Sequence, residues 1–169
     1  MKHIFYHLTA VMVVVVWGMT FISTKVLIVH GLSAQEIFLF RFLLAYAAVC
    51  PISFHRFFAR NLKDELYLVG GGVLGGSLFF FLQNIALGLT QASNVSFIIC
   101  MAPLLTAVLT VLSVRTEKVS RGFIYGSIIA LLGVGLLIFN GSFILRISPL
   151  GDLLTLLASL SWAFYSLVI

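Results

Sequence analysis

Long apolar runs separated by short polar breaks are the feature that most constrains this chain. A bilayer with a hydrocarbon core of about 30 Å is crossed by about 20 helical residues, each rising 1.5 Å. Only 9% of the residues are charged and 62% are hydrophobic, whereas soluble domains carry about 25% charge. The sequence therefore predicts a membrane protein with spans at residues 8–29, 37–54, 66–89, 95–114, 122–139 and 150–169.

The breaks between these runs carry turn and helix-stop residues, as in Asn140-Gly141 and Pro149-Leu150-Gly151. Connections this short make neighbouring spans run antiparallel. A β-barrel strand alternates apolar and polar residues, but residues 11–16 are apolar on all sides. We therefore expect an all-α polytopic transmembrane helix bundle: a five-helix unit plus a sixth helix.

Basic residues gather on one side of the expected bundle. That side holds Lys2, Arg56, Arg60, Lys63, Arg115, Lys118 and Arg121 of the ten Lys and Arg, whereas the opposite loops hold only Arg146. Because cytoplasmic loops are enriched in Lys and Arg, this pattern predicts a cytoplasmic amino terminus. The net charge of +5 follows from the same asymmetry, so it does not indicate a nucleic-acid partner.

An internal repeat links the two ends of the chain. Leu8–Thr24 and Leu153–Ile169 align without a gap, and each has a tryptophan, Trp17 or Trp162, at its tenth position. Five crossings separate the copies, so the second copy would be inverted in the bilayer. Inverted repeats are a known basis for alternating access in transporters. The alternative is that two apolar helices with one Trp each are alike by chance.

Short motifs occur along the whole chain: Trp17-Gly18-Met19-Thr20-Phe21 followed by Lys25, Arg41-Phe42, Ala86-Leu87, Ala92-Ser93, Pro103, Gly151-Asp152-Leu153-Leu154 and Trp162-Ala163. In their order and spacing they resemble the EamA-type branch of the drug/metabolite transporter superfamily. The resemblance implies ten helices in two inverted five-helix repeats. It also implies export or exchange of small metabolites, amino acids or drug-like compounds, and residence in a membrane, which we expect to be the bacterial inner (plasma) membrane.

The resemblance also implies how the chain divides. Residues 1–140 correspond to the first EamA-like repeat, and residues 141–169 to a linker and the first helix of a second, inverted and incomplete repeat. We expect the partners to be the lipid bilayer, a small-molecule substrate, and either a missing second repeat or a second copy of the chain. On this interpretation the 169 residues alone do not transport.

Two cations lie within the expected spans. Lys25 and Arg41 each fall about 6 Å inside the outer end of their span, counting 1.5 Å per residue. If both face one cavity, they favour an anionic substrate that Arg41 grips with two hydrogen bonds. The alternative is that both side chains snorkel to the headgroups or pair structurally, with Glu36 as a partner for either.

Polar residues in the third span mark a second candidate region. Gly70, Gly71, Gly72, Gly75 and Gly76 let another helix approach closely. The stripe of Gly72 and Gly76, continued at 100° per residue, reaches Gln83, with Asn84 beside it. These two amides either line the substrate pathway or form hydrogen bonds that only hold the bundle together.

Further pathway candidates lie in the first and fourth spans. Ser96 and Pro103 share a helical arc, and Pro103 cannot donate a hydrogen bond to the carbonyl of Ile99, which predicts a kink near mid-membrane. Trp17 and Thr20 share an arc of the first span, where Trp17 lies too deep for an interfacial belt. Each of these features is explained equally by helix packing.

Other functions have less support. All five acidic residues fall in loops or at span ends, so a buried carboxylate for proton or sodium coupling is disfavoured here. No His lies inside a span, and the pattern of Cys50 and Cys100 suggests neither a metal site nor a disulfide framework. We therefore expect no cofactor, no metal and no catalytic residue. The alternatives to a carrier are a structural or assembly subunit and, less favoured, a small intramembrane lipid-handling enzyme.

Overall fold

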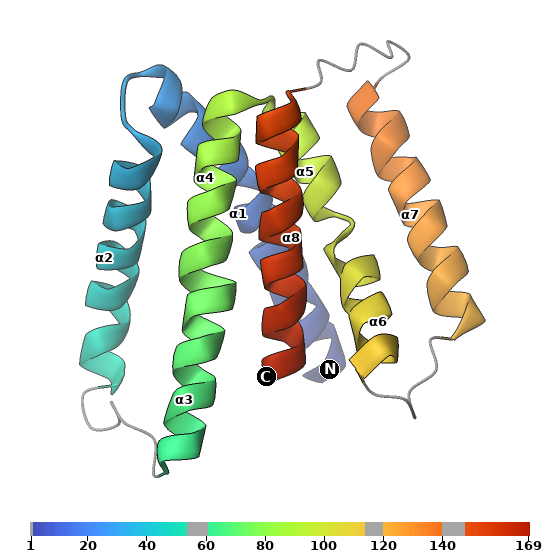
Figure 1. Cartoon of the computed structure of the whole chain (residues 1–169), viewed down its shortest axis with the longest axis horizontal. Coiled ribbons are helices and arrows are strands. Elements are labelled where there is room, and N and C mark those ends of the chain that lie inside the picture. The colour runs from blue at the N-terminus through green and yellow to red at the C-terminus, as the bar shows by residue number, and fades with distance from the viewer. Residues whose placement is uncertain (1, 54–60, 114–119, 140–147) are drawn as a thin grey trace.

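A computed structural model describes residues 2–53, 61–113, 120–139 and 148–169 as helices standing side by side (Figure 1). No strand occurs among these residues, so the all-α prediction is confirmed. The described residues form six helices, of which the third and fourth are divided. They are α1 (Lys2–Val29), α2 (Ala34–Ser53), α3 (Leu62–Gly71) continued by η1 (Gly72–Leu78) and α4 (Phe79–Leu89), α5 (Ala92–Ile99) followed by α6 (Ala102–Ser113), α7 (Arg121–Phe139) and α8 (Pro149–Val168).

Five of these helices are long and apolar enough to cross a membrane, and the qualifying stretch of the remaining one, Arg121–Gly133, is shorter. The helices extend beyond the expected spans at several ends. Helix α3 begins at Leu62, and its first turn contains Asp64 and Glu65. Acidic residues stabilise a helix amino terminus, so the polar flank joins the helix instead of forming a loop.

Successive helices run in opposite directions, as the short connections predict. In Figure 1, α1 rises from the lower end, where both chain ends are drawn, and α8 descends to that same end. We use "lower end" and "upper end" in the sense of this view. Helices α1 and α8, the two copies of the proposed repeat, are therefore antiparallel.

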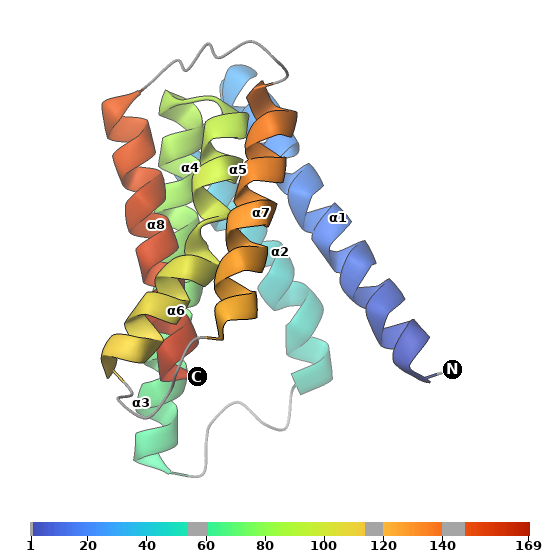
Figure 2. The same cartoon turned by 90° about the vertical axis from the view of Figure 1, so that its right-hand side faces the viewer.

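Helix α8 lies at the centre of the packing, against α4, η1, α5 and α6. Small residues allow this close approach: Ala158, Ser159 and Ala163 are completely buried. Figure 2 shows α8 beside α4 and behind α6, whereas α1 diverges from the bundle toward its lower end. The main core is formed by Phe21, Phe79, Ala86, Leu87, Val95, Ile99 and Ala158.

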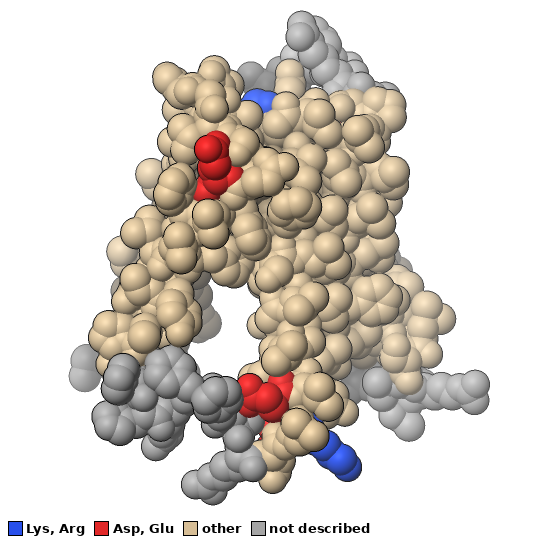
Figure 3. Space-filling model, turned by 60° about the vertical axis from the view of Figure 1, so that its left-hand side comes forward, with Lys and Arg blue, Asp and Glu red and all other residues tan. Residues whose placement is uncertain are grey.

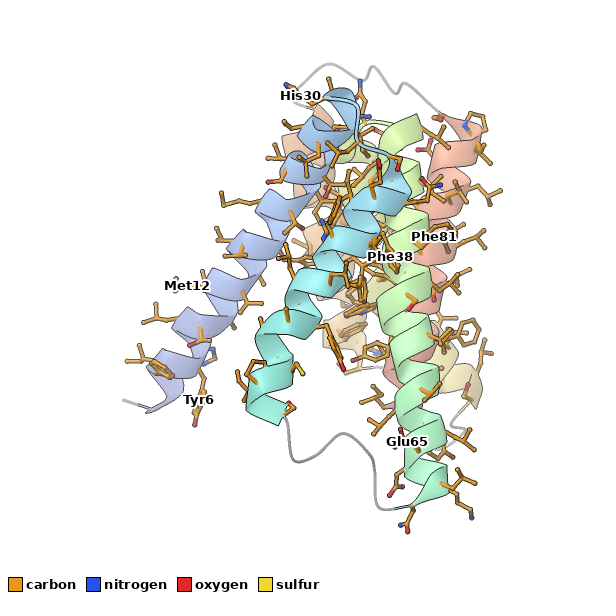
Figure 4. The ribbon with its side chains drawn as sticks, turned by 90° about the vertical axis from the view of Figure 1, so that its left-hand side faces the viewer. Tyr6, Met12, His30, Phe38, Glu65 and Phe81 are labelled. Atoms are coloured by element: carbon orange, nitrogen blue, oxygen red, sulfur yellow. The ribbon has the colours of Figure 1, made fainter. Side chains whose placement is uncertain are left out.

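Helices α1 and α2 present mostly apolar side chains to the outside. Tyr6 and Met12 of α1 are exposed. In Figure 4, Phe38 of α2 faces Phe81 of α4, with ring centroids 5.9 Å apart. In Figure 3 the coloured charges lie toward the two ends of the molecule, and this face is hollowed near its lower end. The uncharged belt between them is the surface expected to meet lipid.

The glycine-rich segment forms a π-helix, which corrects the predicted stripe. Gly71 and Gly75 are buried against α8, whereas Gly72 has nothing within 4 Å of where a Cβ would lie. Hydrogen bonds in a π-helix close over five residues instead of four, so a count of 100° per residue fails across η1. The stripe that faces α8 is Gly71, Gly75 and Phe79, and its next member by the same spacing is Gln83.

The predicted kink at Pro103 is confirmed as a break between α5 and α6. The amides of Leu104 and Leu105 donate to the carbonyl of Met101, at 3.0 and 3.1 Å. Because Pro103 has no N–H, the hydrogen bonding of α5 cannot continue through it. The break lies opposite the middle of α8, next to the region described below.

Candidate functional site

Trp17 and Trp162, the two tryptophans of the proposed repeat, meet in the interior of the bundle. The rings of Trp17 and Trp162 stack with centroids 6.2 Å apart and an interplanar angle of 29°. Phe79 packs against Trp162 at 5.0 Å, and Tyr165 packs against it at 5.1 Å from the next turn of α8. Both tryptophans are half-buried because they border open space on two sides.

The first space, which we call the central cavity, has a volume of about 400 Å³. It lies between the tryptophan pair, the break between α5 and α6, and the middle of α7. Its walls include Phe79, Cys100, Pro103, Ser127 and Ala130 besides the two tryptophans. Among the described residues that line it, none carries a carboxylate, ammonium, guanidinium or imidazole group.

The second space, the lower cavity, has a volume of about 620 Å³ and lies between α1, η1 and α8. Its walls include Val13, Gly72, Gly76, Tyr165 and Ile169, and again Trp17 and Trp162. The tryptophan pair is therefore a shared wall between the two cavities. Because Tyr165 and Ile169 occupy the last turns of α8, the lower cavity extends toward the lower end.

Lys25 contacts the carboxyl end of α4. Its ammonium group donates hydrogen bonds to the carbonyl oxygens of Leu87, at 2.5 Å, and Thr90, at 2.8 Å. Cations are stabilised there by the unpaired carbonyls and the helix dipole. These contacts correspond to the structural-pairing alternative, and Lys25 lines neither cavity; its role in a substrate pathway stays a prediction.

Arg41 bridges α2, α1 and α4. Its guanidinium donates to the hydroxyl of Thr24 at 2.7 Å and lies 5.5 Å from the ring centroid of Phe80. Arg41 and Lys25 thus share the upper part of the bundle but have different partners. The suggested pairing with Glu36 is wrong: Glu36 instead accepts from the amide and hydroxyl of Ser33, at 2.8 and 2.7 Å, and closes a capping box at the start of α2.

Gln83 and Asn84 are both completely buried in α4. Neither polar atom of the Gln83 amide has a hydrogen-bond partner among the described residues, and the same holds for Oδ1 of Asn84. The amide nitrogen of Asn84 donates to the carbonyl of Ala34 over 3.5 Å. Because an unsatisfied buried polar group costs about 1–3 kcal/mol, these amides are the strongest polar anomaly in the described bundle.

Thr20 and Ser96 bond within their own helices. The hydroxyl of Thr20 donates to the carbonyl of Trp17 at 2.6 Å, and that of Ser96 to the carbonyl of Ala92 at 2.8 Å. Such local bonds satisfy a hydroxyl in an apolar environment. Of the eight pathway candidates, the structure brings Trp17 and Pro103 to one cavity. Lys25, Arg41, Gln83, Asn84, Thr20 and Ser96 lie outside the linings of both cavities.

Sequence reasoning missed several lining residues. Trp162 served only for the repeat and the family motifs and was not predicted as a lining residue, although a tryptophan at mid-span carries the same signal as Trp17. Cys100 shares the arc of Pro103, and Ser127 is a hydroxyl in the middle of an apolar helix. Tyr165 and Phe79 gave no distinguishing signal, because aromatic residues at helical spacing usually pack in a core.

A metal site is not assembled from the described residues: no three His, Cys, Asp or Glu side chains among them come together. A polar cluster at the upper end joins three helices. Thr90 donates to Asp152 at 3.2 Å, and Asn94 donates to the hydroxyl of Thr90 at 3.3 Å, joining α5 and α8 to the end of α4.

Comparison with known proteins agrees with this architecture. The sequence model of the EamA-like transporter family matches residues 4–139, which is most of the chain. Curated proteins and solved structures returned no match. The family match confirms the resemblance drawn from the motifs and implies membrane transport of a small molecule. This integral membrane protein, whose described helices line the central and lower cavities, belongs to the EamA-like transporter family.

Proposed function

We propose that the protein is a carrier that exports or exchanges small metabolites, amino acids or drug-like compounds by alternating access. The observation that carries this proposal is the stacked pair of Trp17 and Trp162, which separates two cavities within a bundle of the transporter family. In alternating access, such a wall opens to one side of the membrane at a time. Gln83 and Asn84, buried without full hydrogen bonding, are proposed to join the pathway during this change.

The antiparallel course of α1 and α8 supports an inverted repeat. Residues 1–140 would form the first repeat, and α8 the first helix of the second. If a two-fold axis in the membrane plane relates the copies, residues that contact their own equivalents lie on that axis. Trp17 and Trp162 would then mark the axis, and the remaining helices of the pathway come from a second repeat or from a second copy of the chain.

The proposed location is the bacterial inner membrane, with the lower end in the cytoplasm. Lys63 and Arg121 lie at the lower end in the described part of the chain, in agreement with the excess of cations predicted for that side. The lower cavity then faces the cytoplasm, which suits a protein that takes its solute from inside the cell.

A structural subunit and an intramembrane enzyme, the two alternatives to a carrier, need different features from those of a transporter. A structural or assembly subunit needs only the packing faces of η1 and α8 and no cavities. An intramembrane enzyme needs a nucleophile paired with a base, and the EamA-like family consists generally of transporters without catalytic activity.

Metabolite release from cells tests the proposal. We expect cells in which a second repeat or a second copy of the chain completes the carrier to enrich their medium in specific small solutes, relative to cells in which the same carrier has Arg41→Gln or Gln83→Leu at equal membrane levels. Gln35→Leu, an exposed position on α2, is the matched control and should behave as wild type. Identical medium from all strains, with normal insertion, would favour the structural subunit.

A further inference from the structure

The central cavity has the properties of a site for an uncharged aromatic solute. Its volume of about 400 Å³ exceeds the roughly 150 Å³ that suffices to bind benzene in an apolar cavity, so it has room for two fused rings with substituents. Trp17, Trp162 and Phe79 supply flat aromatic walls, and Ser127 supplies a hydroxyl. Binding pockets of this kind are mainly apolar with a few polar groups that orient the ligand.

The described residues that line the central cavity offer no cationic group to an anionic solute. The two membrane cations are already engaged, Lys25 by the carbonyls of Leu87 and Thr90 and Arg41 by Thr24 and Phe80. A carboxylate moved into the cavity would lose its hydration without a compensating cation, which is strongly unfavourable. The anionic substrate considered from the sequence is therefore not the one that this cavity fits.

Binding of a cationic solute in the central cavity is also unfavourable. An ammonium group gains about 0.5–2 kcal/mol over an aromatic face. Trp17 and Trp162 stack on each other, however, so each ring already has one face covered by its neighbour. Of the acidic side chains in the described helices, Asp152 accepts from Thr90 and Glu36 from Ser33 at the upper end, and Asp64 and Glu65 lie in the first turn of α3 at the lower end. None of the four lines the central cavity. A cation would be desolvated without a carboxylate beside it.

We propose that the central cavity binds an uncharged aromatic small molecule against the Trp17–Trp162 pair. The inference rests on the proposed function only in treating this molecule as a transported solute; its binding is measured without transport. Cys100 lines the cavity and Cys50 lies on α2, away from its lining, so the chain contains both a reporter and a control thiol.

The test measures alkylation of both cysteines by N-ethylmaleimide in membranes, using mass spectrometry, with three probes that share one ring system: indole, indole-3-carboxylate and tryptamine. At about ten times its dissociation constant, indole should slow the labelling of Cys100 roughly tenfold, because the fraction of free sites falls accordingly. Cys50 should be unaffected, and the anion and the cation should protect Cys100 far less. Equal or stronger protection by either charged probe, or protection by none of the three, overturns the proposal.

Filling the cavity provides an independent check. Ala130→Phe places a ring in the central cavity and should abolish protection by indole, whereas Ile129→Phe, at an exposed neighbouring position of α7, should preserve it. The proposed function fails separately: protection by indole without solute release leaves a binding site without transport, whereas release of charged solutes without protection by indole leaves a carrier with a different site.

Discussion

Trp17 and Trp162 stack with ring centroids 6.2 Å apart, and the two rings together line both the central and the lower cavity. They occupy the same position in the two copies of the proposed repeat and come from helices that run in opposite directions. In the proposed mechanism of alternating access, this contact is the one that would have to change.

Removing one ring should join the two cavities. In a Cys50→Ser background, Trp17→Ala is expected to raise the rate at which a membrane-impermeant thiol reagent labels Cys100 from the lower-end face, by roughly tenfold, or about 1.4 kcal/mol. Trp17→Phe keeps an aromatic ring and should stay near the wild-type rate. If Trp17→Ala leaves labelling unchanged from both faces, the pair is not the barrier.

The glycine surface of η1 should tolerate no side chain at Gly75. A Cβ at this position would lie 2.5 Å from Cγ of Tyr165, whereas one at Gly72 would meet nothing within 4 Å. Gly75→Ala should lower the free energy of unfolding by about 1–3 kcal/mol through overpacking, as measured by thermal unfolding in detergent.

Two variants separate a clash with Tyr165 from a general effect on the π-helix. Gly72→Ala should unfold at or above the wild-type temperature, and Tyr165→Ala should remove most of the additional penalty of Gly75→Ala. Equal stability of Gly75→Ala and Gly72→Ala would contradict the close approach of α8.

Lys25 should stabilise the end of α4. Lys25→Met leaves the carbonyls of Leu87 and Thr90 without their charged donor, and a hydrogen bond to a charged group contributes about 1.5–3 kcal/mol. We expect a corresponding loss of stability in chemical unfolding. Lys63→Met, the same change at an exposed lysine, should have little effect. Unchanged stability with altered transport would instead assign Lys25 to the pathway.

Replacing Gln83 by an apolar residue should raise the stability of the protein and lower its transport. Gln83→Met removes two buried polar atoms that lack partners and keeps nearly the same volume, so the protein should become more stable by about 1–3 kcal/mol. Solute release should fall at the same time, because the proposed pathway loses its amide. Gln35→Met at an exposed site is the control. A less stable Gln83→Met would indicate that the amide has a structural partner.

Pro103, Lys25 and Arg41 show why the sequence predicted only part of the candidate site. Pro103 predicted the helix break because a missing N–H acts locally, on the same helix. The partners of Lys25 and Arg41 could not be read in this way, since they lie on other helices. The glycine stripe was misplaced because hydrogen bonds in the π-helix span five residues instead of four, so a regular count of 100° per residue does not hold there.

Four properties could be read from the sequence alone: the membrane environment, the helical class, the order of the spans and the family. They could be read because the length and hydrophobicity of each run depend only on neighbouring residues. Tertiary structure decided that α8 lies at the centre, that Trp17 meets Trp162, and that the lysine and arginine bond to helices instead of lining a cavity. These relationships depend on which faces of different helices meet. In a chain that is apolar on nearly every face, hydrophobic patterning cannot specify those faces, and the packing of glycines, hydroxyls and aromatic rings does.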